Sequence, residues 1–183
     1  QVLEMLTGGG SMDNINTSLA LRLIPLAQDL GKEDLIERLL EHATKVARNE
    51  EERGWAKFEA LKVMEAGLDS FVRLAEEAEH IEQAQALTAA VHHYVALLYL
   101  AETRLDEARA TAQHALRVRQ TANDKQGLAY GMALLMTIVK RQHDEDTAIA
   151  VGTERLELLM ALNDHEGQME ALADIAHCQA TVG

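Results

Sequence analysis

Apolar residues recur three or four positions apart along most of the chain, which is the spacing of one buried face on an α-helix. From Met12 onward these runs are interrupted at polar or glycine-containing breaks, including Gly31, Gly67 and Asn123-Asp124. The pattern predicts nine helices, at residues 14–30, 33–48, 51–66, 69–79, 81–102, 105–121, 125–142, 145–162 and 166–181. Because the connections are short, we expect neighbouring helices to run antiparallel.

One break is repeated along the chain. Asn123-Asp124-Lys-Gln-Gly127 returns in a similar form as Asn163-Asp164-His-Glu-Gly167. Both copies stand between two long predicted helices, where a turn followed by a helix N-cap is expected. A period of about 34 to 45 residues that contains two helices is typical of a solenoid, and the interval between these copies falls within it.

Composition agrees with an all-α fold. The chain has 48% hydrophobic residues but only 3% aromatic residues and a single proline. Such a core must be built from small aliphatic contacts, and alanine lets helix axes approach closely. The sequence therefore predicts an all-α solenoid of antiparallel helix pairs, with about nine helices.

Charge and cysteine content narrow the possible partners. A net charge of −13 opposes binding to nucleic acid or to an anionic membrane surface. Apolar runs are short: Val95 to Ala101 covers seven residues, against the roughly 20 that a membrane-spanning helix needs. The single cysteine, Cys178, cannot form an intrachain disulfide, so we expect a cytoplasmic protein with no membrane insertion.

The clearest helix pair carries a recognisable pattern, His92-x-x-Val95-Ala96-x-x-Tyr99 followed by Ala108-x-x-x-Ala112-x-x-Ala115. It resembles the tetratricopeptide repeat, from which His92 and Ala112 depart, and weaker copies cover most of the chain. The resemblance implies a right-handed α-solenoid of four repeats and a terminal helix. A generic α-solenoid without this ancestry stays open as the alternative.

The resemblance also implies a concave groove, lined by the first helix of each pair, that binds a peptide. The residues expected to face this groove are Arg22, Arg53, Lys57, Met64, His93, Tyr94, Leu97, Tyr130, Leu134, Lys140 and Arg141, with Val63, Leu100, Asp174 and His177 beside them. An apolar floor with basic edges would take an amphipathic segment that carries leucines and a carboxylate. In the alternative interpretation, Tyr94 and Tyr130 pack between neighbouring pairs and the cations are solvated.

The first eleven residues differ from the rest. Gly8-Gly9-Gly10-Ser11 has the composition of a flexible linker, and Met12 resembles a native start, so we expect the repeat domain to cover residues 12–183. Gln1 to Thr7 is either an added tag or a ligand peptide fused to its own receptor. The apolar residues Val2, Leu3, Met5 and Leu6 around Glu4 suit a segment that docks in an apolar groove.

No constellation predicts catalysis, a cofactor or a metal site. His92 and His93 are adjacent and diverge by about 100° on a helix, and Cys178 is expected to be a buried or frayed bystander. The favoured function is therefore a non-enzymatic module that binds a partner peptide. The alternatives are a peptide-sensing region of a larger regulator and a homodimer through an apolar stripe of the terminal helix, comprising Ala171, Leu172, Ile175 and Ala176.

Overall fold

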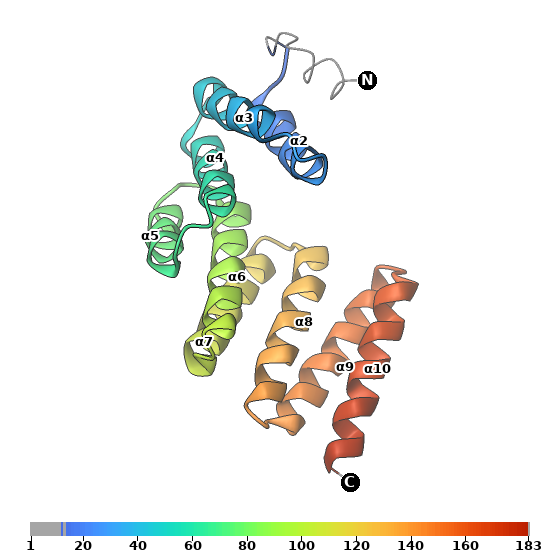
Figure 1. Cartoon of the computed structure of the whole chain (residues 1–183). Coiled ribbons are helices and arrows are strands. Elements are labelled where there is room, and N and C mark those ends of the chain that lie inside the picture. Colours follow the sequence, from blue (N-terminus) through green and yellow to red (C-terminus); the bar gives the residue numbers. More distant parts are fainter. Residues whose placement is uncertain (1–11, 13, 183) are drawn as a thin grey trace. The chain divides into compact units, whose positions relative to one another are not determined.

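The computed structural model describes residue 12 and residues 14–182, and this part of the chain is all-helical with no strand (Figure 1). The predicted fold class and the nine predicted helices are confirmed over these residues. The helices are α2 (Thr17–Asp29), α3 (Glu33–Val46), α4 (Glu50–Val63), α5 (Leu68–Glu79), α6 (Gln85–Ala101), α7 (Leu105–Thr121), α8 (Lys125–Arg141), α9 (Glu145–Ala161) and α10 (His165–Val182). None of them is both long enough and apolar enough to span a membrane.

The largest difference from the predicted bounds is at α6, which begins at Gln85 instead of residue 81. Residues 81–84 form a turn in which Gln83 has a φ of +63° and the N–H of Ala84 donates to the carbonyl of Ile81 over 3.3 Å. A residue in the left-handed region interrupts the helical hydrogen-bond ladder. The apolar spacing continues through this turn, which is why the sequence pattern did not reveal it.

The chain divides into two compact units, Gln1–Leu87 and Thr88–Gly183, which we term the N-terminal and C-terminal units. Within the N-terminal unit α2, α3, α4 and α5 pack in succession, and α2 also contacts α4. Its core contains Ala20, Ile24, Ala27, Leu39 and Ala43, all fully buried. The N-terminus of α4 is capped by Asn49, whose side chain accepts from the N–H of Glu52 over 2.8 Å.

Within the C-terminal unit α7, α8, α9 and α10 pack in succession. Small residues are buried at the helix contacts: Ala96, Ala108 and Ala115, as the sequence predicted, and also Ala112, each no more than 2% exposed. Since an alanine has no side chain beyond Cβ, these positions allow a close approach of the helix backbones.

The turns of the C-terminal unit recur at a constant interval. Positive φ angles between +54° and +59° occur at Thr103, Asn123, His143 and Asn163. The residue after each of them donates its backbone N–H to the carbonyl five positions earlier, over 2.9–3.0 Å. The donor–acceptor pairs are Arg104–Tyr99, Asp124–Arg119, Asp144–Val139 and Asp164–Leu159. This pattern is the Schellman helix end. Two successive helices therefore occupy the interval from Asn123 to Asn163, which is the interval between the two Asn-Asp copies in the sequence.

The N-terminal unit uses the same helix end at a shorter interval. Gly31 at the end of α2 has a φ of +62°, and Glu65 at the end of α4 has a φ of +49°. The N–H of Lys32 donates to the carbonyl of Ala27, and the N–H of Ala66 donates to the carbonyl of Leu61, both over 2.9 Å. Corresponding turns of successive pairs in this unit thus lie at positions 31 and 65, closer together in sequence than positions 123 and 163 of the other unit.

Candidate functional site

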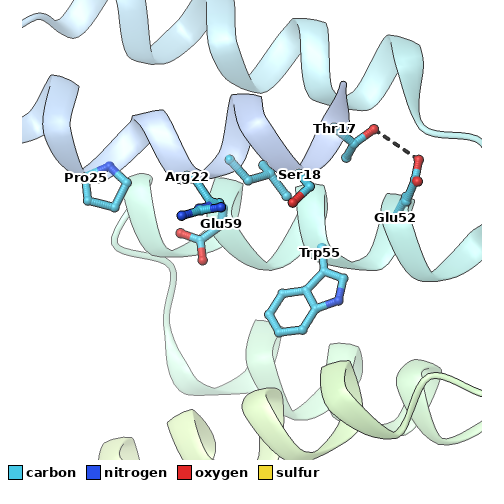
Figure 2. Close-up of a pocket in the computed structure, with 8 residues that line it drawn as sticks. Thr17, Ser18, Arg22, Pro25, Glu52, Trp55 and Glu59 are labelled. Atoms are coloured by element: carbon cyan, nitrogen blue, oxygen red, sulfur yellow. Dashed lines mark hydrogen bonds between the residues drawn. The ribbon is translucent and has the colours of Figure 1, made fainter. Parts of the chain in front are cut away.

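A pocket of about 370 Å³ lies between α2 and α4 in the N-terminal unit (Figure 2). These are the first helices of two successive pairs, the position at which the sequence predicts a binding groove. The mostly apolar pocket is lined by Thr17, Ser18, Leu21, Arg22, Pro25, Glu52, Trp55 and Glu59. The α2 residues follow one another at helical spacing, so they form one wall, and the α4 residues form the other.

Pro25 changes the chemistry of the α2 wall. A proline has no N–H, so the carbonyl of Leu21, four positions earlier, lacks its helical donor. The helix nevertheless continues to Asp29. Leu21 and Pro25 both line the pocket.

Two of the three charged side chains that line this pocket, Glu52 and Glu59, have partners within the protein. Glu52 accepts from the Thr17 hydroxyl over 3.1 Å and from the N–H of Arg48 over 2.8 Å. Glu59 pairs with Lys62 at 3.0 Å. Figure 2 shows Arg22 and Glu59 pointing toward each other across the pocket, but no described residue forms an ion pair with Arg22. Arg22 is exposed at the edge of the pocket.

The other residues predicted to bind in this unit lie outside the pocket lining. Arg53 and Lys57 are exposed on α4, and Lys57 forms an ion pair with Glu77 of α5. Met64 follows the last residue of α4 and is 74% exposed. The structure thus places only Arg22, among the four predicted residues of this unit, in the pocket.

In the C-terminal unit the predicted residues His93 of α6 and Tyr130 of α8 meet. Their ring centroids are 4.6 Å apart with an interplanar angle of 31°. Tyr130 is 62% exposed, whereas His93 is only 7% exposed. Burial, and secondarily the nearby charge of Arg119, lowers the pKa of His93 to about 4, so its ring is neutral at pH 7. Tyr94 is half-buried and Leu97 is exposed on the same helix.

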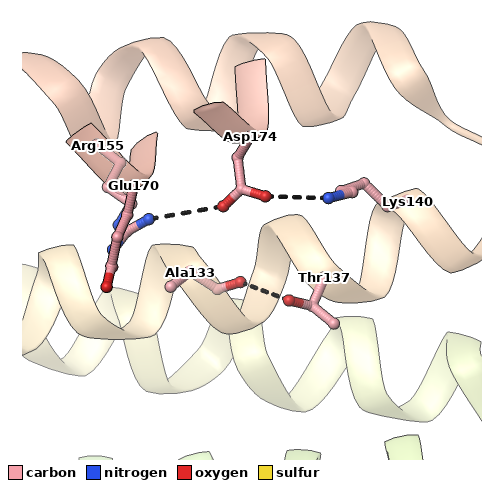
Figure 3. Close-up of polar contacts among 6 residues, drawn as sticks. All are labelled: Ala133, Thr137, Lys140, Arg155, Glu170 and Asp174. Carbon is pink, nitrogen blue, oxygen red and sulfur yellow. Dashed lines mark hydrogen bonds and ion pairs between the residues drawn. The ribbon is translucent and has the colours of Figure 1, made fainter. Parts of the chain in front are cut away.

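The remaining predicted residues have structural partners. Leu134 is buried in the hydrophobic core of the C-terminal unit, so it offers little surface to a ligand. Lys140 pairs with Asp174 of α10 at 3.0 Å, and Arg141 donates to the carbonyl of Leu100 over 3.4 Å. Figure 3 shows Asp174 between Lys140 and Arg155, with one carboxylate oxygen toward each.

A second pocket, of about 460 Å³, is lined by residues of α8, α9 and α10, and we term it the α8–α10 pocket. Its lining residues are Gln126, Ala129, Tyr130, Arg155, Leu159, Leu162, Asp164, Glu166, Gly167 and Glu170. Arg155 is 7% exposed and pairs with Glu170 at 3.1 Å, so its charge is balanced from within the protein. This pocket is acidic, unlike the basic groove that the sequence predicted for this unit.

Sequence reasoning missed Leu21, Pro25 and Trp55 in the first pocket and Arg119 and Arg155 in the second unit. A signal existed for the first group, since residues 18, 21, 22 and 25 share one helical face and Trp55 is the only tryptophan. Cys178 is buried in the core, where burial raises the pKa of its thiol. No protein-family model matches the chain, and no curated protein is significantly similar to it.

Proposed function

We propose that this protein is a non-enzymatic helical-repeat module that binds a short, amphipathic and partly acidic peptide of a partner protein. The α2–α4 pocket carries the proposal, because it joins an apolar lining to an arginine that has no ion pair with a described residue. Its volume lies in the range of about 300–1,000 Å³ that is usual for ligand sites. An aliphatic side chain would fill the pocket beside Trp55 while Arg22 binds a carboxylate.

The wall beside Pro25 supports a peptide over a simple fatty or aromatic ligand. A peptide has backbone N–H groups that can donate to the Leu21 carbonyl, and leaving such an acceptor unpaired would cost free energy once a ligand covers it. The residues Gln1 to Thr7 have the required character, with four apolar side chains around Glu4, although they lie outside the described residues. We propose this segment as a representative of the natural ligand.

The repeat spacing supports the proposed relation to tetratricopeptide repeats. The interval from Gly31 to Glu65 in the N-terminal unit matches the length of that repeat, which is about 34 residues. The interval from Asn123 to Asn163 in the C-terminal unit is longer and would represent a longer variant. A cytoplasmic location is proposed on the single, buried cysteine.

Trp55 provides a direct test, because it is the only tryptophan and it lines the pocket. In a variant that lacks residues 1–11, adding the synthetic peptide Gln-Val-Leu-Glu-Met-Leu-Thr should change Trp55 fluorescence in a saturable manner. Arg22→Glu should weaken binding by about 1–3 kcal/mol, or roughly 5- to 150-fold, because it replaces the cation that binds the carboxylate with a like charge.

The matched control is Arg117→Glu, which makes the same charge change at an exposed arginine of α7 that lines neither pocket. It should leave the affinity unchanged. An unaltered Trp55 spectrum at saturating peptide, or equal losses in both variants, would refute binding in the α2–α4 pocket.

A second candidate function, self-association through α10, is favoured by exposed apolar residues on that helix. Met169 is 72% exposed and Leu172 is 53% exposed, and Ala173 and Ala176 are exposed beside them. The stripe differs from the one predicted, because Ala171 and Ile175 are buried. If α10 forms a dimer, sedimentation equilibrium should show a mass that rises with concentration and a monomer in Leu172→Glu. A wild-type protein that is monomeric at all concentrations removes this candidate.

A further inference from the structure

Arg119 of α7 is a buried arginine that crosses to the neighbouring helix. It is only 7% exposed, and its Nη1 donates to the carbonyl of Gly127 on α8 over 2.8 Å. A Cβ atom at Gly131 would lie 2.6 Å from the same nitrogen. Glycine at both positions therefore leaves the space that the guanidinium occupies against the α8 backbone.

No described residue supplies Arg119 with an ion-paired carboxylate. The negative charge of Asp124 attracts the guanidinium without forming an ion pair with it. The Oδ1 atom of Asp124 accepts a hydrogen bond from the N–H of Gly127. An arginine has five N–H donors, and among the described residues only the carbonyl of Gly127 accepts from one of them. The unbonded nitrogens of Arg119 are not among the fully buried side-chain atoms, so they keep some exposure to solvent.

Arg155 in the same unit is a buried arginine whose charge is paired within the protein. It is also 7% exposed, but Glu170 lies 3.1 Å and Asp174 lies 3.9 Å from its guanidinium. Burying a cation is costly unless it is paired. Arg155 has two carboxylate partners and Arg119 has none among the described residues, so the pairing of Arg119 is incomplete in the structure.

Two aromatic rings lie beside Arg119. Its guanidinium carbon lies 5.9 Å from the ring centroid of Tyr130, which is 62% exposed and packs on His93. We propose that Arg119, flanked by Tyr130 and His93, binds a carboxylate group of the partner peptide. This inference deepens the proposed function and rests on it only for the origin of the carboxylate.

The charge pattern favours a single carboxylate over a polyanion. A guanidinium edge presents two parallel N–H groups that match the two oxygens of a carboxylate. His93 is neutral at pH 7 and adds no second positive charge. The chain has a net charge of −13, so a multiply charged ligand would be repelled more strongly than a single carboxylate.

The test follows the Nε–Hε resonances of arginine in the full-length protein by ¹⁵N NMR during titration with sodium acetate at pH 7. Arg119→Lys and Arg155→Lys assign the two buried arginines. We expect a saturable shift of the Arg119 resonance and none of the Arg155 resonance, because the latter already has two carboxylate partners. Tyr130→Ala should weaken the acetate response about fivefold, because it removes the aromatic cover beside the guanidinium.

Sodium chloride at equal ionic strength is the control for general charge screening, and Arg117 is the control for exposed arginines. An acetate response that chloride reproduces, or that Arg155 shares, would overturn the proposal. A stronger response to phosphate than to acetate would also overturn the assigned ligand. These outcomes do not depend on Trp55, which lies in the other unit, so failure here is distinguishable from failure of peptide binding at the α2–α4 pocket.

Discussion

The N-terminal and C-terminal units each build a pocket between successive helix pairs, but the two pockets differ in polarity. The α2–α4 pocket is mostly apolar and holds an arginine that forms no ion pair with a described residue. The α8–α10 pocket has three carboxylates in its lining, and its arginine is internally paired. The backbone arrangement thus supplies the cavity, and a few side chains at helical spacing decide what can bind there.

The units also differ in the length of their helices. Helices α2 to α5 contain 12 to 14 residues, whereas α7 to α10 contain 17 or 18. At 1.5 Å per residue, the longer helices add roughly one turn, or about 5 Å, to each wall. This extra turn accounts for most of the difference between the shorter and the longer repeat interval.

Core truncation tests whether the two units are energetically separate. Leu39→Ala in the N-terminal unit and Ile138→Ala in the C-terminal unit each remove a fully buried side chain. We expect each change to lower the free energy of unfolding of its own unit by about 2–5 kcal/mol. Hydrogen exchange should show loss of amide protection in that unit only, because repeats are stabilised mainly by their neighbours. Equal loss of protection in both units would show that they unfold together.

Acid should destabilise the C-terminal unit through His93. Because the folded pKa of His93 is about 4, below its ordinary value of 6.5, the unfolded state binds the proton first as pH falls. The free energy of unfolding is therefore highest above pH 6.5. It decreases by about 3 kcal/mol at most as the pH falls toward 4. Urea unfolding at pH 7 and pH 4.5 should show this loss, and His93→Gln should reduce it. His143→Gln, at an exposed histidine, is the control and should retain the wild-type difference.

The smallest expected effects come from the helix ends. Thr103 is β-branched and has a φ of +59°, so Thr103→Gly should raise the free energy of unfolding by about 1 kcal/mol. Gly31 has a φ of +62°, and Gly31→Ala should lower it by a similar amount. Thermal unfolding should therefore shift in opposite directions in the two variants. A decrease in both would mean that the Thr103 side chain contributes more than its backbone strain costs.

Local signals explain the accuracy of the predicted helices. The breaks at Asn123-Asp124 and Asn163-Asp164 were placed correctly because an asparagine tolerates positive φ and an aspartate caps the next helix. The start of α6 was predicted wrongly because Gln83 adopts positive φ without being a residue type that favours it. Only contacts with the rest of the fold can impose such a conformation.

The residues that line the proposed binding surfaces were harder to predict from the sequence than the helices were. Arg22 was identified as a pocket residue, but Leu134 points into the core and Lys140 pairs with Asp174 of a helix that is not its sequence neighbour. A shift of one residue turns a side chain by about 100° on a helix, so a small error in the assumed register moves it from groove to core. The same uncertainty hid Trp55, which lines the pocket from α4.

For this protein the sequence alone determined the helical class, the positions of the helices and most of their ends, because those depend on interactions between residues close in the chain. The tertiary structure decided which side chains face a cavity and which charges are paired. Arg119 is the clearest case. Two glycines on another helix make room for its guanidinium, and no described acid pairs with it; neither fact is a property of its local sequence.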